Sequence, residues 1–140
     1  MTRNLRWIYF GWLALTVVAI VLQFYLAGYG VFAFKGLPPF DPHLLVGDLI
    51  GLASLIGIGL AFAARAPWRI TGINGAFFVL MIIQAILAHT GVQAISALHV
   101  VNGVLIFAVT GYLTRQVWLL ASEGGAGAPA SAATSAPARM

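Results

Sequence analysis

Two histidines that share a local pattern are the residues best suited to chemistry in this chain. His43 opens the segment His-Leu-Leu-Val-Gly and His99 opens His-Val-Val-Asn-Gly. Residues four apart lie on one face of a helix, so each imidazole would have bare backbone beside it, at Gly47 or Gly103. Neutral imidazole is a good metal ligand, and the bare patch would admit a flat ligand. The pattern therefore favours one haem b bound between His43 and His99.

Ligation by two histidines would leave no open position on the iron, which favours electron transfer over catalysis at the metal. The chain contains no cysteine, so iron–sulfur clusters, thiolate-ligated haem and disulfides are excluded. His89 is the third candidate ligand, and Lys35 is a candidate partner for a haem propionate. The alternatives for this site are a copper or zinc ion without porphyrin, or a carotenoid, chlorophyll or quinone as the flat ligand. Without any ligand, His43 would be an interfacial residue and His99 a buried hydrogen-bonding one.

Asp48 is a carboxylate well inside an apolar run. Ionisable groups at such depth are costly and are often functional. It could relay a proton, contact a quinol or bond to a ligand histidine, although it lies five positions after His43 and so on another helix face. The competing interpretation is a protonated side chain bonded to Asn74, Gln84 or Asn102.

The elements that must position these residues are membrane helices. Of the 140 residues, 61% are hydrophobic and only 7% are charged, whereas soluble domains carry about 25% charged residues. A membrane-spanning helix needs about 20 apolar residues, and four runs meet this length, at about 7–34, 43–64, 70–89 and 94–119. The expected fold is an all-α, integral membrane four-helix bundle over residues 1–121. Residues 122–140, rich in Ala, Gly, Ser and Pro, are expected to be a disordered tail.

The basic residues indicate the orientation of these helices. Six of the seven fall before the first run, between the second and third, or after the fourth: Arg3, Arg6, Arg65, Arg69, Arg115 and Arg139. Lys35 alone falls on the other side. Basic residues accumulate on the cytoplasmic side, so both termini are predicted to be cytoplasmic in the inner membrane of a prokaryote. Topology explains the positive charge, and no nucleic-acid partner is expected.

An internal repeat relates the two histidine segments. Residues 21–30 align with residues 82–91, with Gln23 matching Gln84, and each segment is followed by a loop and a His-x-x-x-Gly. The chain is thus predicted to contain two similar helical hairpins related by an axis along the membrane normal. That axis would carry His43 onto His99. His89 aligns with Gly28, and it ranks third for this reason.

Short motifs give the chain a family resemblance. Gln23 with Gly30-Val-Phe, Phe40-Asp-Pro-His-x-x-x-Gly47 and Ala97-Leu-His-Val-Val-Asn102 resemble the DUF6220 family of small prokaryotic membrane proteins, over most of residues 7–120. The resemblance implies four spans, with the two histidines as signature positions, and no established activity. By analogy with four-helix cytochromes of the b561 type, one haem near the non-cytoplasmic side could exchange electrons with a quinol or a periplasmic redox protein. This chain lacks the second histidine pair of the di-haem members.

Two other functions remain open at this point. The chain could be a cofactor-free accessory or structural subunit of a larger membrane complex, because helix 43–64 has a glycine-rich face suited to close packing. It could also be a small transporter or channel in which Asp48 and the two glutamines line a path. Motifs of soluble enzymes, such as phosphate loops or paired carboxylates, are absent from the sequence. An electron carrier or a subunit is therefore expected rather than a stand-alone enzyme.

Overall fold

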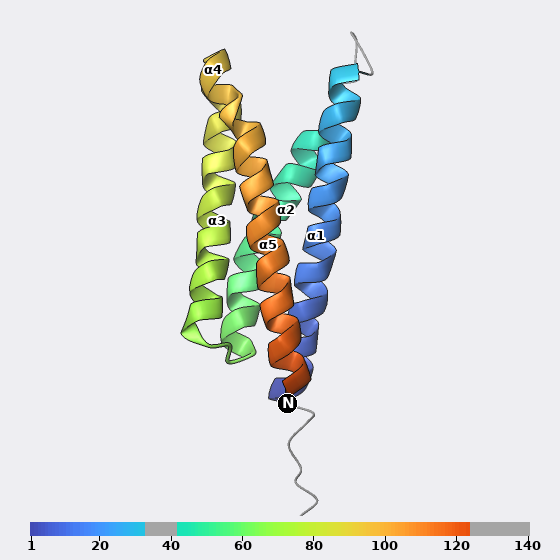
Figure 1. Cartoon of the computed structure of the whole chain (residues 1–140), viewed down its shortest axis with the longest axis vertical. Coiled ribbons are helices and arrows are strands. Elements are labelled where there is room, and N and C mark those ends of the chain that lie inside the picture. The colour runs from blue at the N-terminus through green and yellow to red at the C-terminus, as the bar shows by residue number, and fades with distance from the viewer. Residues whose placement is uncertain (33–41, 124–140) are drawn as a thin grey trace, which may run out of the picture.

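Five helices make up the described part of the chain, which in this computed structural model comprises residues 1–32 and 42–123. In chain order they are α1 (Thr2–Phe32), α2 (Pro42–Ala63), α3 (Trp68–His89), α4 (Gln93–Ser96) and α5 (Leu98–Glu123) (Figure 1). These two ranges contain no strand. The predicted all-α four-helix fold is confirmed, with the one-turn α4 as an addition. The predicted disordered tail falls almost wholly outside the described residues.

The helix ends follow local chemistry. Pro42 occupies the first position of α2, where its fixed φ suits the helix and its missing N–H costs nothing. α3 ends at His89, and Gly91 lies two residues further on with φ 68°, the left-handed conformation typical of a glycine that ends a helix. The predicted helix 94–119 is interrupted instead. At the break, Val100 N–H bonds to the Ala97 carbonyl three residues back rather than four.

Four segments in the described ranges are long and apolar enough to span a membrane. They comprise most of α1, all of α2 and α3, and α4 together with α5. At 1.5 Å per residue, the 22 residues of α2 or α3 extend about 33 Å, close to the roughly 30 Å hydrocarbon core. Large apolar side chains are exposed on every span, such as Leu15, Leu52, Val79 and Val104. Lipid covers such surface in a membrane protein, so the chain is a multi-pass membrane protein.

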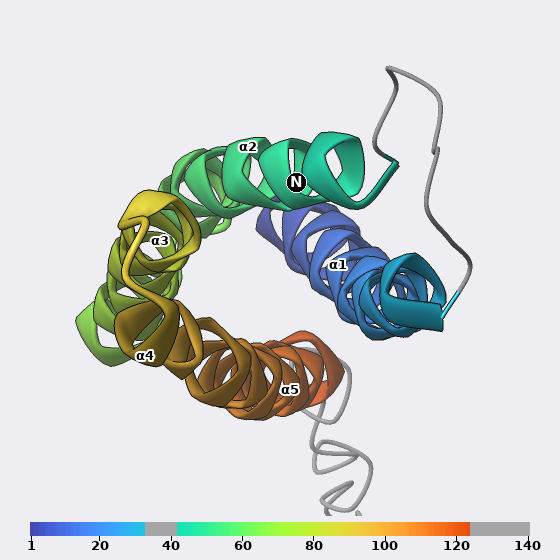
Figure 2. The same ribbon diagram turned by 90° about the horizontal axis from the view of Figure 1, so that it is seen from above.

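The spans form a ring in the order α1, α2, α3, α5, as the view from above shows (Figure 2). Consecutive spans are antiparallel, which gives one hairpin of α1 and α2 and a second of α3 and α5 (Figure 1). The start of α1, the α2–α3 turn and the end of α5 lie at one end of the bundle, here called the terminal end. The opposite end is the loop end. Which end faces the cytoplasm stays a prediction.

Two apolar clusters close the bundle from its middle to the terminal end. The terminal cluster consists of Tyr9, Leu13, Ala61, Ala64, Ile70, Leu113 and Val117. The middle cluster consists of Ile20, Ile50, Phe77 and Ile106, one residue from each span. All these side chains are buried. Toward the loop end the two hairpins diverge (Figure 1), and the functional candidates lie there.

Candidate functional site

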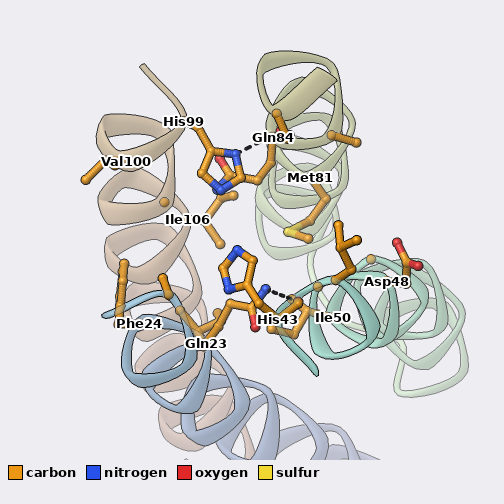
Figure 3. Close-up of a pocket in the computed structure, with 18 of the residues that line it drawn as sticks. Gln23, Phe24, His43, Asp48, Ile50, Met81, Gln84, His99, Val100 and Ile106 are labelled. Atoms are coloured by element: carbon orange, nitrogen blue, oxygen red, sulfur yellow. Dashed lines mark hydrogen bonds between the residues drawn. The ribbon is translucent and has the colours of Figure 1, made fainter. Parts of the chain in front are cut away.

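A cavity of about 540 Å³ lies between the hairpins at the loop end. Its floor includes Ile20, Ile50 and Ile106 of the middle cluster, and most of its lining is apolar (Figure 3). All three histidines of the sequence line it, together with Gln23, Gln84 and Asp48. The volume falls within the roughly 300–1,000 Å³ typical of small-molecule sites. The cavity therefore brings together candidate residues that are far apart in the sequence.

His43 and His99 face each other across this cavity (Figure 3). Their ring centroids are 6.1 Å apart and their planes are inclined by 56°. Each histidine is the second residue of its helix, α2 or α5, and each is half-buried. The helix break at Ala97 makes the two positions equivalent, because it places His99 in the first turn of α5, just as His43 lies in the first turn of α2. The pair predicted from the repeat is thus brought together, one residue from each hairpin.

Hydrogen bonds to residue 84 engage both ring nitrogens of His99. Nδ1 lies 3.2 Å from the backbone oxygen of Gln84, and Nε2 lies 3.1 Å from the amide nitrogen of the Gln84 side chain. A carbonyl oxygen only accepts, so Nδ1 carries the proton and donates it. Nε2 then accepts from the amide N–H. His99 is the neutral Nδ1–H tautomer, with its Nε2 lone pair directed at Gln84.

Asn102 fixes the orientation of the Gln84 amide. Its Nδ2 donates to Gln84 Oε1 at 2.7 Å and to the Leu80 carbonyl at 2.9 Å. With Oε1 facing Asn102, the Gln84 nitrogen faces the His99 ring. From the sequence, Gln84 and Asn102 are candidate hydrogen-bond partners of Asp48 rather than of each other. The link of His99 to Gln84 was missed, although the alignment of Gln84 with Gln23 marked the residue.

The first hairpin uses its glutamine differently. Gln23 Nε2 donates to the backbone oxygen of His43 at 2.7 Å (Figure 3). The Gln23 Oε1 atom is buried and has no hydrogen-bond partner within residues 1–32 and 42–123. At the position equivalent to Asn102, three residues after the histidine, this hairpin has Val46. Val46 has no side-chain donor, so it cannot hold Gln23 Oε1 and turn Nε2 toward a histidine ring as Asn102 does for Gln84.

The two glycines lie beneath these glutamine side chains. A Cβ atom built on Gly47 would lie 2.9 Å from Gln23 Nε2, a separation that forces movement. A Cβ on Gly103 would lie 3.5 Å from Gln84 Nε2 and from Phe24, an ordinary contact distance. The sequence predicted bare backbone open to a ligand at both positions. In this structure the glutamine amides occupy the space beside both glycines.

Two of the other candidate residues are more exposed than the histidine pair. Asp48 lines the cavity but is exposed, and its carboxylate points away from the two rings (Figure 3). His89 also lines the cavity and is exposed, and its Nδ1 donates to the Ala85 carbonyl at 2.7 Å. Lys35 lies outside the described residues. Within the described chain, no group of three or more His, Asp or Glu side chains is arranged to hold a metal ion.

Comparison with known proteins gives one finding. A family model described as a family of unknown function, DUF6220, matches residues 23–92, which is half of the chain. This segment contains Gln23, His43 and Gln84 but ends before His99. No similar protein was found among curated proteins or among solved structures. The analogy with cytochromes of the b561 type therefore has no support from these comparisons.

Proposed function

Because the chain belongs to the DUF6220 family, whose function is unknown, we propose a function from the cavity itself. We propose that the protein is a membrane cytochrome in which His43 and His99 bind one haem b from opposite sides. The observation that carries this proposal is the separation of the two imidazole rings, 6.1 Å between centroids. With metal–nitrogen bonds of about 2 Å on each side, two imidazoles on one ion have centres roughly 6 Å apart.

Two further features of the cavity support this group over a bare metal ion, and a third supports metal binding by His99 in general. Two imidazoles alone supply too few ligands for a zinc or copper site, whereas a porphyrin brings four nitrogens of its own. The apolar lining and the volume of about 540 Å³ suit a bulky organic ligand. The Nδ1–H of His99 bonds to a backbone carbonyl, which is the usual arrangement of a metal-binding histidine.

The residues of the chain would then have separate tasks. His43 and His99 would hold the haem, which with two histidine ligands would supply electron transfer rather than binding of oxygen or substrate. The isoleucines of the cavity floor would exclude water from the terminal side. A haem held in this way carries one electron at a time. We propose a membrane quinol or a periplasmic redox protein as the exchange partner, with the site on the non-cytoplasmic side of a prokaryotic inner membrane.

Haem titration of the purified protein tests this proposal. The apo protein in detergent is titrated with haemin, alongside His43→Ala, His99→Ala and the matched control His89→Ala. We expect the wild type and the control to bind one haem per chain. Each ligand variant should lose more affinity than the roughly 10- to 100-fold caused by removing an outer-shell partner. Equal haem binding by all four proteins would contradict the assignment.

One observation favours a second candidate, a cofactor-free subunit of a larger membrane complex. Gln84 already satisfies both ring nitrogens of His99, so this imidazole needs no ligand to complete its hydrogen bonding. This candidate predicts a colourless protein that purifies with a stoichiometric partner. A solitary haem-bound preparation would exclude it.

A further inference from the structure

Residue 84 contacts His99 in two ways that have opposite consequences for metal binding. Its backbone oxygen accepts the Nδ1 proton, which holds the ring in place and leaves Nε2 deprotonated. Its side-chain amide donates to Nε2, the nitrogen that a metal would need. The single lone pair of Nε2 can accept this hydrogen bond or bind a metal, but not both. The backbone oxygen of Gln84 therefore keeps Nε2 of His99 able to bind a metal, while the Gln84 side chain occupies the same atom with a hydrogen bond.

Asn102 holds the Gln84 amide in this orientation. Asn102 is 8% exposed, and its two N–H groups account for the bonds to Gln84 Oε1 and to the Leu80 carbonyl. If the Gln84 amide turned over, two N–H groups would face each other at 2.7 Å. The contact between the Gln84 amide and the His99 ring is thus specified by a buried residue, not by chance rotation at a surface.

We propose that the Gln84 side chain is a gate on the site: it occupies Nε2 of His99 in the apo protein and must leave before haem binds. This inference rests on the proposed function. When the amide leaves, the Nδ1–H bond to the backbone oxygen of Gln84 can persist, so the His99 ring keeps its tautomer and its orientation. Gln84 is therefore a positioning residue that sets the rate and affinity of haem loading.

The first hairpin supplies a matched control. Gln23 occupies the aligned position, lines the same cavity and donates at 2.7 Å, but it donates to a backbone oxygen and not to a ring. A Gln23→Leu variant has the same change in size and polarity as Gln84→Leu. It removes the hydrogen bond to the His43 backbone oxygen, but it does not remove a donor to a histidine ring nitrogen. Any general effect of losing a buried amide should appear in both variants.

The first experiment measures haemin uptake by the apo protein through the Soret absorbance, for wild type, Gln84→Leu and Gln23→Leu. Since one net hydrogen bond no longer competes with the metal, we expect Gln84→Leu to bind haem about three- to tenfold more tightly and faster than wild type. Gln23→Leu should not gain affinity. Slower or weaker binding by Gln84→Leu than by Gln23→Leu would overturn the gate.

A second experiment separates this inference from the proposed function. The ¹⁵N NMR spectrum of the apo protein, with labelled histidines, reports which nitrogen of His99 is protonated and whether the other accepts a hydrogen bond. We expect an Nδ1–H tautomer whose Nε2 resonance shifts in Gln84→Leu but not in Gln23→Leu. If no variant binds haem, the proposed function fails. If the Nε2 resonance does not respond to Gln84→Leu, the gate fails whatever the haem result.

Discussion

The two hairpins share a plan but bond their histidines differently. In each, a glutamine on the first helix lies over the glycine of a His-x-x-x-Gly on the second, and the histidine is the second residue of its helix. In the first hairpin the amide of Gln23 bonds to the backbone of His43. In the second, the amide of Gln84 bonds to the ring of His99. The two aligned glutamines thus bond different parts of their histidines, one the main chain and the other the ring.

One position accounts for this difference. Asn102 in the second hairpin corresponds to Val46 in the first, and only Asn102 can donate to a glutamine oxygen. Its amide holds Gln84 Oε1 and so turns Nε2 toward the ring. Gln23 Oε1 has no such donor in the described structure. A single polar side chain in a repeated framework is therefore enough to give two similar sites different chemistry.

Asn102→Val should have the largest effect on this comparison, because it makes the second hairpin like the first. It leaves Gln84 Oε1 buried without its donor, at a cost of about 2 kcal/mol in the free energy of unfolding. Unfolding of the apo protein in mixed micelles measures this loss. Histidine ¹⁵N NMR should show the Nε2 bond of His99 weakened. An unchanged stability and an unchanged His99 spectrum would mean that Asn102 does not orient Gln84.

Gly47→Ala and Gly103→Ala test the contacts beneath the two glutamines. A methyl group at Gly47 would displace Gln23 Nε2 and weaken its bond to His43, a loss of about 1 kcal/mol. At Gly103 the methyl group would meet its neighbours at an ordinary distance, so the cost should be below about 0.5 kcal/mol. Thermal unfolding in detergent compares the two. A larger loss of stability for Gly103→Ala than for Gly47→Ala would contradict the closer packing of the glutamine against Gly47.

Val46→Asn is the reciprocal substitution to Asn102→Val. It offers Gln23 Oε1 a donor and should turn the Gln23 amide away from the His43 carbonyl, with a net change within about 1 kcal/mol. The informative measurement is the ¹⁵N spectrum of His43, which should shift toward that of His99. A spectrum identical to wild type would show that the asparagine alone does not transfer the arrangement from one hairpin to the other.

Much of this framework could be predicted from the sequence, because it depends on local chemistry. The four apolar runs, the glycine cap at Gly91 and the pairing of His43 with His99 follow from composition, spacing and the repeat. Helix ends were less predictable. No glycine or proline marks the break at Ala97, where the Val100 N–H bonds to the carbonyl three residues back.

The hydrogen-bond partners and orientations of the polar side chains could not be predicted in the same way. Gln84 carries a donor and an acceptor on a flexible stem, and its partners depend on which atoms of α5 come within hydrogen-bond distance. The same applies to Asp48: its position in the sequence indicates depth in the membrane but not that its carboxylate points away from the histidines. Tertiary contacts between spans decide these orientations, and no single segment encodes them.

The most direct test of the central claim is the absorption spectrum of the detergent-purified protein, first oxidised and then reduced with dithionite, from cells supplied with a haem precursor. Binding of one haem between His43 and His99 predicts a sharp Soret band and resolved α and β bands on reduction, as for low-spin b haem. A colourless protein, or a spectrum with an open axial position, would contradict it.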